Sequence, residues 1–568
     1  MRYLKRCFLV PTSVLFSTLI AIAPVIGGEP EIVHDEPLWV GDELIYPEGA
    51  TIPRYMTELE REFLKRFPHV PSSRALTAPP TLPIHCVAEY EPMEGLLFAW
   101  EGGSPFVNSS TDILPTMIKH ITTTAAARAY VVVDTSGEQS TATSMLTTAG
   151  ANMSNVQFVI RTTDSVWIRD YGPRYIYHGQ CRGIVDHDYN RPTRPNDDAF
   201  PSYFSTVKHH AYYEHQLVHG GGNYHLDALN RSYATELIWN ENPGLSHTQI
   251  HDIWQDFQNV DTHIFPPFPT SVDSTQHLDM WMQVIADDKV VISDWPNNVG
   301  STQDVICDNA ATYMAGQGYT VYRVPARSLS GVHYTYTNVV LLNDVILLPT
   351  YTNATIVSAG HNGQALATWQ TAMPGKTIIQ VNCQAMVGLA GVMHCIVMHV
   401  PIHLGGANPT AYLENYRGGE VLTPGADIEI NWITDDDVGV VNVDLLLSTD
   451  GGVNYDTTIA SMTADDGSHL WTVPNICSQQ ARIKVVARNA LDKLGVDAST
   501  SNLSISGPSP VGDMDCNCLV ELADVPNMVD ALVDPDTYGG CDIDLADLNG
   551  DTFVDGADLQ QFVNTIAP

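Results

Sequence analysis

The chain has 568 residues and a formal net charge of -38 at pH 7, from 65 acidic against 27 basic side chains. Its length allows several domains, with a sizeable core in at least one of them. The acidic excess argues against nucleic-acid or anionic-membrane partners and suits a soluble protein or one that binds cations.

Residues 1–28 have the pattern of a secretory signal peptide, in which basic residues precede an apolar run that ends in two glycines. An uncleaved membrane anchor is the alternative, but Pro11 and Pro24 interrupt the run and make it a poor spanning helix. We therefore expect a secreted or extracytoplasmic protein without membrane contact beyond this segment.

Residues 29–80 are Pro-rich and acidic at first, with one amphipathic helical stretch around Tyr55 to Phe67. This composition is typical of a lead-in segment rather than a domain. The sequence leaves open whether the segment is removed.

Residues 81–415 alternate short apolar runs with helical stretches such as Gln364 to Met373, which predicts an α/β catalytic domain. The apolar runs are Gly95 to Trp100, Ala129 to Val133, Val156 to Ile160, Val290 to Ile292 and Val339 to Leu348. Residues 416–507 change to alternating strands and predict a β-sandwich of a size common among immunoglobulin-like domains.

Residues 510–568 contain two loops with calcium-type spacing, in which oxygen ligands recur at every second residue and an acid stands at the twelfth position. The candidate ligands are Asp513, Asp515, Asn517, Glu521 and Asp524 in the first loop, and Asp547, Asn549, Asp551, Asp555 and Asp558 in the second. Cys518 and Thr552 replace the usual glycine at the sixth position. A merely solvated acidic tail is the alternative, but it does not explain the fixed spacing.

This segment resembles a dockerin type I module, whose two loops each precede a helix, here Val525 to Leu532 and Leu559 to Thr565. The resemblance implies bound Ca²⁺ and a cohesin-like surface partner, although such a module could also be a calcium-stabilised end cap.

Of the ten cysteines, Cys7 would leave with the signal peptide, so nine remain. An odd number leaves at least one thiol unpaired within the chain, and Cys395 is the candidate. Cys516, Cys518 and Cys541 could pair among themselves or with Cys477.

Cys395 follows His394 in a short motif, and two acid-bearing motifs stand far upstream: 167–173, with Asp170, and 275–279, with His277 and Asp279. A thiol, a histidine that moves protons and two carboxylates that hold a cation are what attack on a guanidinium carbon needs. A buried structural cysteine is the alternative when Cys395 is taken alone. For the histidine, a second His-Leu-Asp at 225–227 is an equal candidate on spacing.

These motifs, together with 88–95 and 220–223, are similar in order and approximate spacing to the family of bacterial peptidylarginine deiminases and agmatine deiminases. The resemblance covers about 335 of the 568 residues. It implies a pentein fold, a five-bladed α/β propeller, with Cys395 as nucleophile, His277 as general acid/base and Asp170 and Asp279 gripping the guanidinium. It implies no cofactor for catalysis. Gly220 to Asn223 also matches a lipase oxyanion loop, but without a Gly-x-Ser-x-Gly elbow we interpret it as a tight turn.

Arg191 and Arg194 are braced by prolines and predict a carboxylate clamp, because each guanidinium can make a forked pair. Bacterial peptidylarginine deiminases carry a similar run that reads the carboxylate of a C-terminal arginine, whereas the inserted Thr193 here leaves the register open. Pairing of one arginine with Asp197 or Asp198 is the alternative. Trp167 and Asn338 also match substrate-pocket positions, or could be core residues.

The resulting hypothesis is a secreted hydrolase that converts peptidyl or free arginine to citrulline and ammonia through a covalent thiouronium intermediate. An agmatine deiminase, as used in putrescine biosynthesis, is the second hypothesis; the arginine pair and the export signal oppose it. A non-catalytic, calcium-dependent surface-binding protein is the third.

Overall fold

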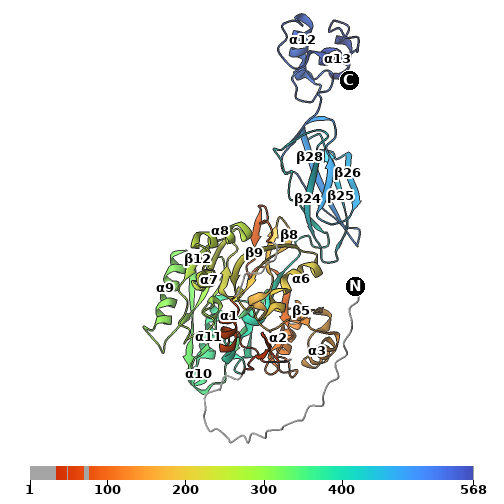
Figure 1. Cartoon of the computed structure of the whole chain (residues 1–568). Coiled ribbons are helices and arrows are strands. Elements are labelled where there is room, and N and C mark those ends of the chain that lie inside the picture. The colour runs from red at the N-terminus through yellow and green to blue at the C-terminus, as the bar shows by residue number, and fades with distance from the viewer. Residues whose placement is uncertain (1–33, 48, 69–75, 567–568) are drawn as a thin grey trace.

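The computed structural model describes residues 34–47, 49–68 and 76–566, so the expected signal peptide lies outside it. A large α/β body is followed by a β-sandwich and then by a small helical module at the C-terminal end (Figure 1). None of the helices in the described ranges has the length and hydropathy needed to cross a bilayer.

Five sheets of the α/β body share one pattern, an antiparallel strand pair continued by a parallel one. A parallel pair needs a crossover connection, which the chain supplies as a helix. The strands, in sheet order, are β21 (Met398–Pro401), β4 (Met93–Ala99), β5 (Arg128–Val133) and β6 (Val156–Ile160); β3 (Ile84–Cys86), β7 (Arg174–His178), β8 (Cys181–Tyr189) and β9 (Ala211–His219); β10 (Tyr224–Leu226), β11 (Arg231–Thr235) and β12 (Asp261–Phe265); β13 (Met282–Ala286), β14 (Lys289–Asp294) and β15 (Thr320–Pro325); β18 (Val340–Leu342), β19 (Val345–Thr350) and β20 (Thr377–Asn382). The crossover helices are α2 (Ile113–Thr123) and α3 (Ser136–Ala149) in the first sheet, and α6 (Phe200–Lys208), α8 (His247–Gln258), α9 (Thr302–Gly316) and α11 (His361–Ala372) in the other four.

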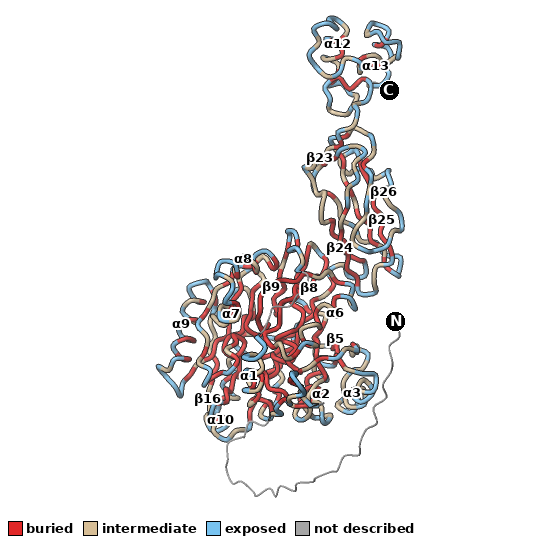
Figure 2. Tube along the Cα trace, viewed as in Figure 1, coloured by how far each residue is buried: buried red, intermediate tan, exposed pale blue. Residues whose placement is uncertain are grey.

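The apolar runs expected from the sequence form these strands. All but Val156 to Ile160, which forms the edge strand β6 and is largely half-buried, are buried because parallel strands are covered on both faces. All but the first residue of β5 are buried, for example. β21 closes the body by pairing antiparallel with β4. Buried residues fill the middle of the body, whereas the C-terminal module is mostly exposed (Figure 2).

Two sheets form the β-sandwich around Trp432 and Leu445, both fully buried. β22 (Thr410–Leu413), β24 (Asp427–Asp435) and β27 (Ser468–Thr472) form one sheet; β23 (Val421–Leu422), β30 (Leu503–Ser506), β28 (Cys477–Asn489), β25 (Val440–Ser448) and β26 (Thr457–Thr463), with β29 (Leu494–Ala498) on β28, form the other. The expected alternation is visible in β24, whose core-facing residues include Ile430 and Trp432.

A buried arginine joins the sandwich to the α/β body. Arg182 of β8 donates from Nε to Asp435 Oδ2 at 2.9 Å and from Nη2 to Oδ1 at 3.0 Å, and both side chains are fully buried. Such a forked pair fixes orientation as well as distance.

Disulfides tie the C-terminal module together and to the sandwich. Cys477 of β28 is bonded to Cys518, and Cys516 is bonded to Cys541. These two bonds give the disulfide pairing of the four C-terminal cysteines, which the sequence left open. The helices expected after the two loops are α12 (Val525–Val533) and α13 (Leu559–Ile566).

The segment before residue 80 forms a hairpin of β1 (Leu38–Val40) and β2 (Glu43–Ile45) and a helix, α1 (Glu58–Arg66). Thr57 caps α1 in a capping box with Glu60. The expectation of a mere lead-in is wrong in one respect: between hairpin and helix, residues 52–54 are buried inside the α/β body. We call residues 34–68, as far as they are described, the lead-in segment.

Candidate active site

Five short segments, each directly before an antiparallel strand of one of the five sheets, carry the candidate site. They are α4 (Ile168–Tyr171) before β7, η2 (Gly221–Asn223) before β10, η3 (Leu278–Met280) before β13, residues 335–339 before β18 and η5 (Met393–Ile396) before β21. α4 lies against both η2 and η5, and η2 against η3. One repeated position of the fold thus brings distant residues together.

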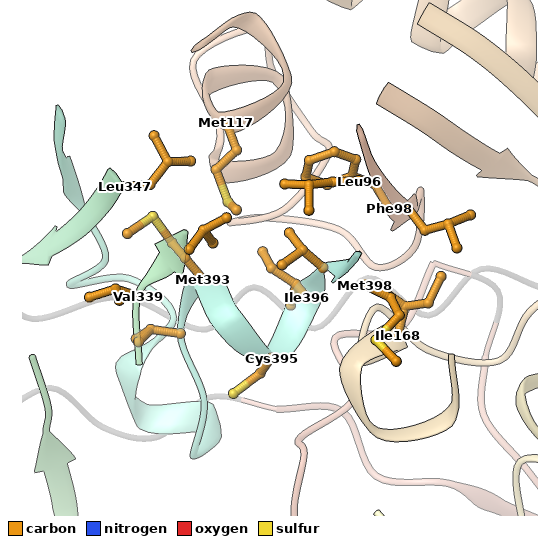
Figure 3. Close-up of a cluster of buried hydrophobic side chains, with 14 of the residues drawn as sticks. Leu96, Phe98, Met117, Ile168, Val339, Leu347, Met393, Cys395, Ile396 and Met398 are labelled. Carbon is orange, nitrogen blue, oxygen red and sulfur yellow. The ribbon is translucent and has the colours of Figure 1, made fainter. Parts of the chain in front are cut away.

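Cys395 lies in η5 with its sulfur turned away from the apolar cluster that surrounds its backbone (Figure 3). Its Sγ is 3.1 Å from Asn338 Nδ2 and 3.5 Å from Asp279 Oδ2. Asn338 Oδ1 also accepts from the backbone N–H of His394 at 3.1 Å, which orients the amide. The sulfur therefore faces polar groups, unlike a cysteine that only fills core space.

Asp170 and Asp279 face each other beside this sulfur, both essentially without solvent exposure. His277 places Nδ1 3.4 Å from Asp170 Oδ1. The predicted catalytic residues are thus brought together.

The glycine turn at 220–223 gives these carboxylates room, so its interpretation as a tight turn alone was too narrow. A Cβ at Gly222 would lie 2.8 Å from Asp170 Oδ1 and 2.8 Å from Asp279 Oδ2. The Gly222 N–H donates to Asp170 at 3.1 Å, and Asn223 Oδ1 accepts from the Leu278 N–H at 3.2 Å. The turn therefore positions the acid-bearing segments.

The side chain of Arg54, from the lead-in segment, lies between the two carboxylates. It donates to Asp170 from Nε at 2.8 Å and from Nη2 at 2.7 Å, and to Asp279 from Nη1 at 3.1 Å and from Nη2 at 3.0 Å. Nη2 is also 2.7 Å from His277 Nδ1. The cluster therefore holds a planar guanidinium in charge-assisted bonds on two sides.

Three successive carbonyls of the same segment meet three of the predicted substrate-binding residues. Trp167 Nε1 donates to the Ile52 carbonyl at 2.9 Å. Arg194 Nη2 donates to the Pro53 carbonyl at 3.0 Å. Arg191 donates to the Arg54 carbonyl from Nη2 at 3.1 Å and from Nε at 3.3 Å. The pocket therefore holds an arginine together with its peptide backbone.

Residues 85–401 match the family model of the Porphyromonas-type peptidyl-arginine deiminases. The chain belongs to this family. It is accordingly a hydrolase of the deiminase type, acting on C–N bonds of guanidino groups.

Relatives with curated descriptions include an agmatine deiminase of Pseudomonas putida, 22% identical over 364 residues, which span 56% of this chain and 95% of that protein. Solved structures similar to this deiminase include an agmatine deiminase of C. jejuni with substrate bound, at 17% identity, 57% and 97% coverage of the two chains and a TM-score of 0.47. Another is an agmatine deiminase of Enterococcus faecalis, at 19% identity, 56% and 96% coverage and a TM-score of 0.47.

The sequence predicted that Arg191 and Arg194 form a clamp around one carboxylate. In the structure the two side chains contact different groups. Arg191 reaches the Arg54 carbonyl, whereas Arg194 also donates to Glu60 of α1 at 3.2 Å. The inserted Thr193 donates to the same carboxylate at 2.8 Å, so the insertion turns Arg194 toward α1. Pairing with the nearby acids is not their main contact, since Asp197 accepts from Ser165.

The structure separates the two His-Leu-Asp copies. His277 and Asp279 contact the site, whereas Asp227 pairs with Arg231 at 2.6 Å on the far side of β10. His225 stacks on the His394 ring at 5.3 Å between centroids and serves as packing behind the site.

Four contributors were not predicted: Arg54, Glu89, Arg169 and His394. His394 bridges Asp279, at 3.0 Å from Nδ1, and Glu89, at 3.0 Å from Nε2. Arg169 donates to Glu89 at 2.8 Å. All but Arg54 stand inside the motifs already singled out, and their place in those motifs was the available signal. Arg54 carries no local signal.

Arg54 influences the pKa values of the ionisable side chains around it in the site. Burial acts to raise the pKa of Asp170, but the Arg54 guanidinium outweighs it, and that pKa lies well below its ordinary value. Burial raises the pKa of the Cys395 thiol well above its ordinary value, with Arg54 opposing the rise. Burial, then repulsion by Arg54, lowers the pKa of His277. A neutral thiol and a neutral imidazole thus stand beside ionised carboxylates.

The C-terminal loops form a second candidate site, for a metal ion. Carboxylate oxygens of Asp513, Asp515 and Asp524 lie within 4.8 Å of one another. Residues 508–568 contain no Lys, Arg or His, so no basic side chain of the module can neutralise them. Carboxylate oxygens are the ligand type that Ca²⁺ takes.

The two loops repeat one backbone conformation. The residues at the sixth position, Cys518 and Thr552, have φ of 72° and 73°, the left-handed region that glycine normally supplies. In the first loop Asp513 accepts from the Cys518 N–H at 2.9 Å; in the second Asp547 accepts from the Thr552 N–H at 2.8 Å. The glycine substitutions noted in the sequence therefore do not abolish the turn.

Proposed function

We propose that this deiminase hydrolyses the guanidinium of peptidyl arginine to citrulline and releases ammonia. The observation that carries the proposal is the position of Arg54, whose guanidinium lies between Asp170 and Asp279 while its own carbonyl lies on Arg191. A substrate arginine in the same place would set its Cζ before Cys395, since both carboxylates grip the flanking nitrogens.

The reaction then follows from the groups at hand. The Cys395 thiol gives its proton to His277, and the thiolate forms a bond to Cζ. His277 returns the proton to the leaving nitrogen, the C–N bond breaks and ammonia departs. Water, deprotonated by His277, attacks the thiouronium carbon; the C–S bond breaks and the ureido product leaves. The substrate cation favours the thiolate, which offsets the burial of the sulfur.

Agmatine is the second candidate, because curated relatives carry that name. The contacts to the backbone favour arginine instead: agmatine has no carbonyl for Arg191 or Arg194 to bind. Arg54 has peptide bonds on both sides, so the pocket fits an internal arginine; a terminal carboxylate at Arg191 would add a charge-assisted bond.

The remaining parts extend the proposal. We propose that the five sheets form a pentein propeller, that the strands from Thr410 to Ser506 form an immunoglobulin-like sandwich, which begins a few residues before the expected boundary at 416, and that residues 510–568 are a dockerin-like module. The module would hold Ca²⁺ through its paired loops and dock to a cohesin-like surface partner outside the cell. The repeated loop conformation supports the calcium sites, and the two disulfides suit an oxidising compartment.

The test is citrulline and ammonia release from four compounds: a peptide ending in arginine, the same peptide amidated, free arginine and agmatine. The enzyme is the full chain carrying Arg54→Gln, so that the pocket is open. We expect turnover of both peptides, with the free-carboxylate peptide faster. Turnover of agmatine alone would overturn the substrate assignment. An absence of turnover with all four compounds would overturn the proposed deiminase activity.

A further inference from the structure

The lead-in segment is held in the active site mainly by polar contacts. The hydrophobic clusters of the described chain contain no residue from it. Leu38 and Val40 of its hairpin are exposed at 60% and 58%, and a cavity of about 830 Å³ lies between β2 and acidic side chains of the α/β body such as Glu101. Its docking therefore depends on the Arg54 side chain, on the three carbonyls, on Glu60 and on two further hydrogen bonds. The Arg54 N–H donates to the Leu389 carbonyl at 3.0 Å, and Thr51 Oγ1 donates to the Ser104 carbonyl at 3.2 Å.

An external arginine has to displace this segment before it can bind. Arg54 already engages both carboxylates, and its side chain has no solvent exposure. A tethered group competes at an effective concentration on the order of millimolar. The site as it stands is therefore filled by a guanidinium of the chain itself, held by the two carboxylates that are predicted to grip the substrate.

We propose that Arg54 is the first substrate of its own active site, and that its conversion to citrulline opens the site to external arginine. This inference depends on the proposed function. Cys395 attacks Cζ of Arg54, ammonia leaves, and water releases the sulfur, so that one guanidinium and one water give one ureido group and one ammonium ion. No further reactant is consumed.

Citrulline at position 54 cannot hold the lead-in segment in the site as Arg54 did. A ureido group is neutral and offers fewer N–H donors, so Asp170 and Asp279 lose the cation between them. Two buried carboxylates without a cation repel each other and gain by contact with water or with a new guanidinium. The carbonyl contacts to Trp167, Arg191 and Arg194, the Glu60 contacts and the backbone N–H of residue 54 then have to compete with an incoming peptide without the two central ion pairs.

Mass spectrometry of the peptide containing residue 54 tests the proposal. The purified full chain should carry citrulline there, with NH exchanged for O, and the Cys395→Ala chain should keep arginine. Arg61 is the internal control: it stands on the same segment but is exposed on α1, paired with Glu58 at 3.2 Å, and should stay arginine in both. Isotope-labelled Cys395→Ala protein incubated with active enzyme should also keep arginine, since its Arg54 is buried in its own site.

Rates with an arginine-terminated peptide provide the second readout. Arg54→Lys keeps a cation that cannot be deiminated, and we expect it to be at least about tenfold slower than Arg54→Gln, because a tethered competitor remains. Arginine at position 54 of a wild-type chain that releases citrulline from added peptide would overturn the inference and leave the function standing. Arginine at position 54 together with no release by Arg54→Gln would mean that the proposed function itself fails.

Discussion

Two of the carboxylate clusters in the described part of the chain have their charge neutralised in opposite ways. At the centre of the α/β body, Asp170 and Asp279 are buried and share the Arg54 guanidinium. In the C-terminal module, the acids around Asp513 belong to a stretch without any basic residue and accept backbone N–H groups instead. The first cluster is complementary to a flat organic cation, which the chain itself supplies; the second is complementary to a small metal ion from outside.

The largest effect should follow removal of the nucleophile. Cys395→Ala should lower kcat for arginyl peptide by at least about a thousandfold, because no other group can form the covalent intermediate. Citrulline release measures it. The matched control is Cys383→Ala, another buried free cysteine, whose Sγ points to the Val381 carbonyl at 3.6 Å. An equal loss in both variants would contradict a role specific to Cys395.

Breaking the central cluster should cost more stability than breaking any surface pair. Asp279→Asn leaves Arg54 and His394 with a neutral partner and should lower the free energy of unfolding by about 3–5 kcal/mol. Urea denaturation of the Cys395→Ala background, in which Arg54 stays charged, measures it. Asp344→Asn is the control, since Asp344 is 90% exposed and paired with Lys376 at the surface, and it should change stability by less than about 1 kcal/mol. Similar values for both would show that Arg54 is not held as described.

The terminal cluster should respond to calcium and not to guanidinium compounds. Saturating Ca²⁺ at about 100 times Kd should stabilise the module by about 2.7 kcal/mol, and a chelator should remove that gain. Calorimetry of the full chain measures it. Asp524→Ala should abolish the response, whereas the exposed Asp536→Asn, outside both loops, should keep it. No shift of Tm with calcium would count against metal binding.

The acidic residues of both clusters could be predicted from the sequence, but on different grounds. Cys395, His277, Asp170 and Asp279 stand in motifs that could be matched, although spacing alone did not separate His277 from His225. The calcium-type loops were also predictable, because their ligands are close in sequence.

Arg54 could not be predicted. It lies in a Pro-rich segment without periodicity, and its partners are 116 and 225 residues away, so only the folded body brings them together. The position of Arg194 was missed for a related reason: the inserted Thr193 bonds to Glu60, and the effect of that insertion depends on α1, a separate element.

Arg191 should separate peptides from agmatine. Its bond to a carbonyl or carboxylate is charge-assisted, so Arg191→Gln should raise KM for an arginyl peptide by about tenfold or more. KM for agmatine, which offers no carbonyl there, should change little. Steady-state kinetics in the Arg54→Gln background measure both. Equal increases would place Arg191 outside substrate recognition.

The smallest expected effect is a loss of folding stability at acidic pH. The pKa of Asp170 is well below its ordinary 3.8, so its contact with Arg54 contributes stability that is fully present above about pH 5 and is lost as pH falls through the lowered value. In the Cys395→Ala background, stability from urea denaturation should therefore be level from neutral pH to about pH 5 and fall below about pH 4. Arg54→Gln in that background should flatten the fall; an unchanged slope would contradict the assignment.

The most direct test of the central claim is a crystal structure of the Arg54→Gln, Cys395→Ala chain with a peptide that ends in arginine. We expect the peptide's guanidinium within hydrogen-bond distance of both Asp170 and Asp279, and its carboxylate on Arg191. A peptide bound elsewhere, with the space between the two carboxylates left to water, would show that these carboxylates do not bind the substrate.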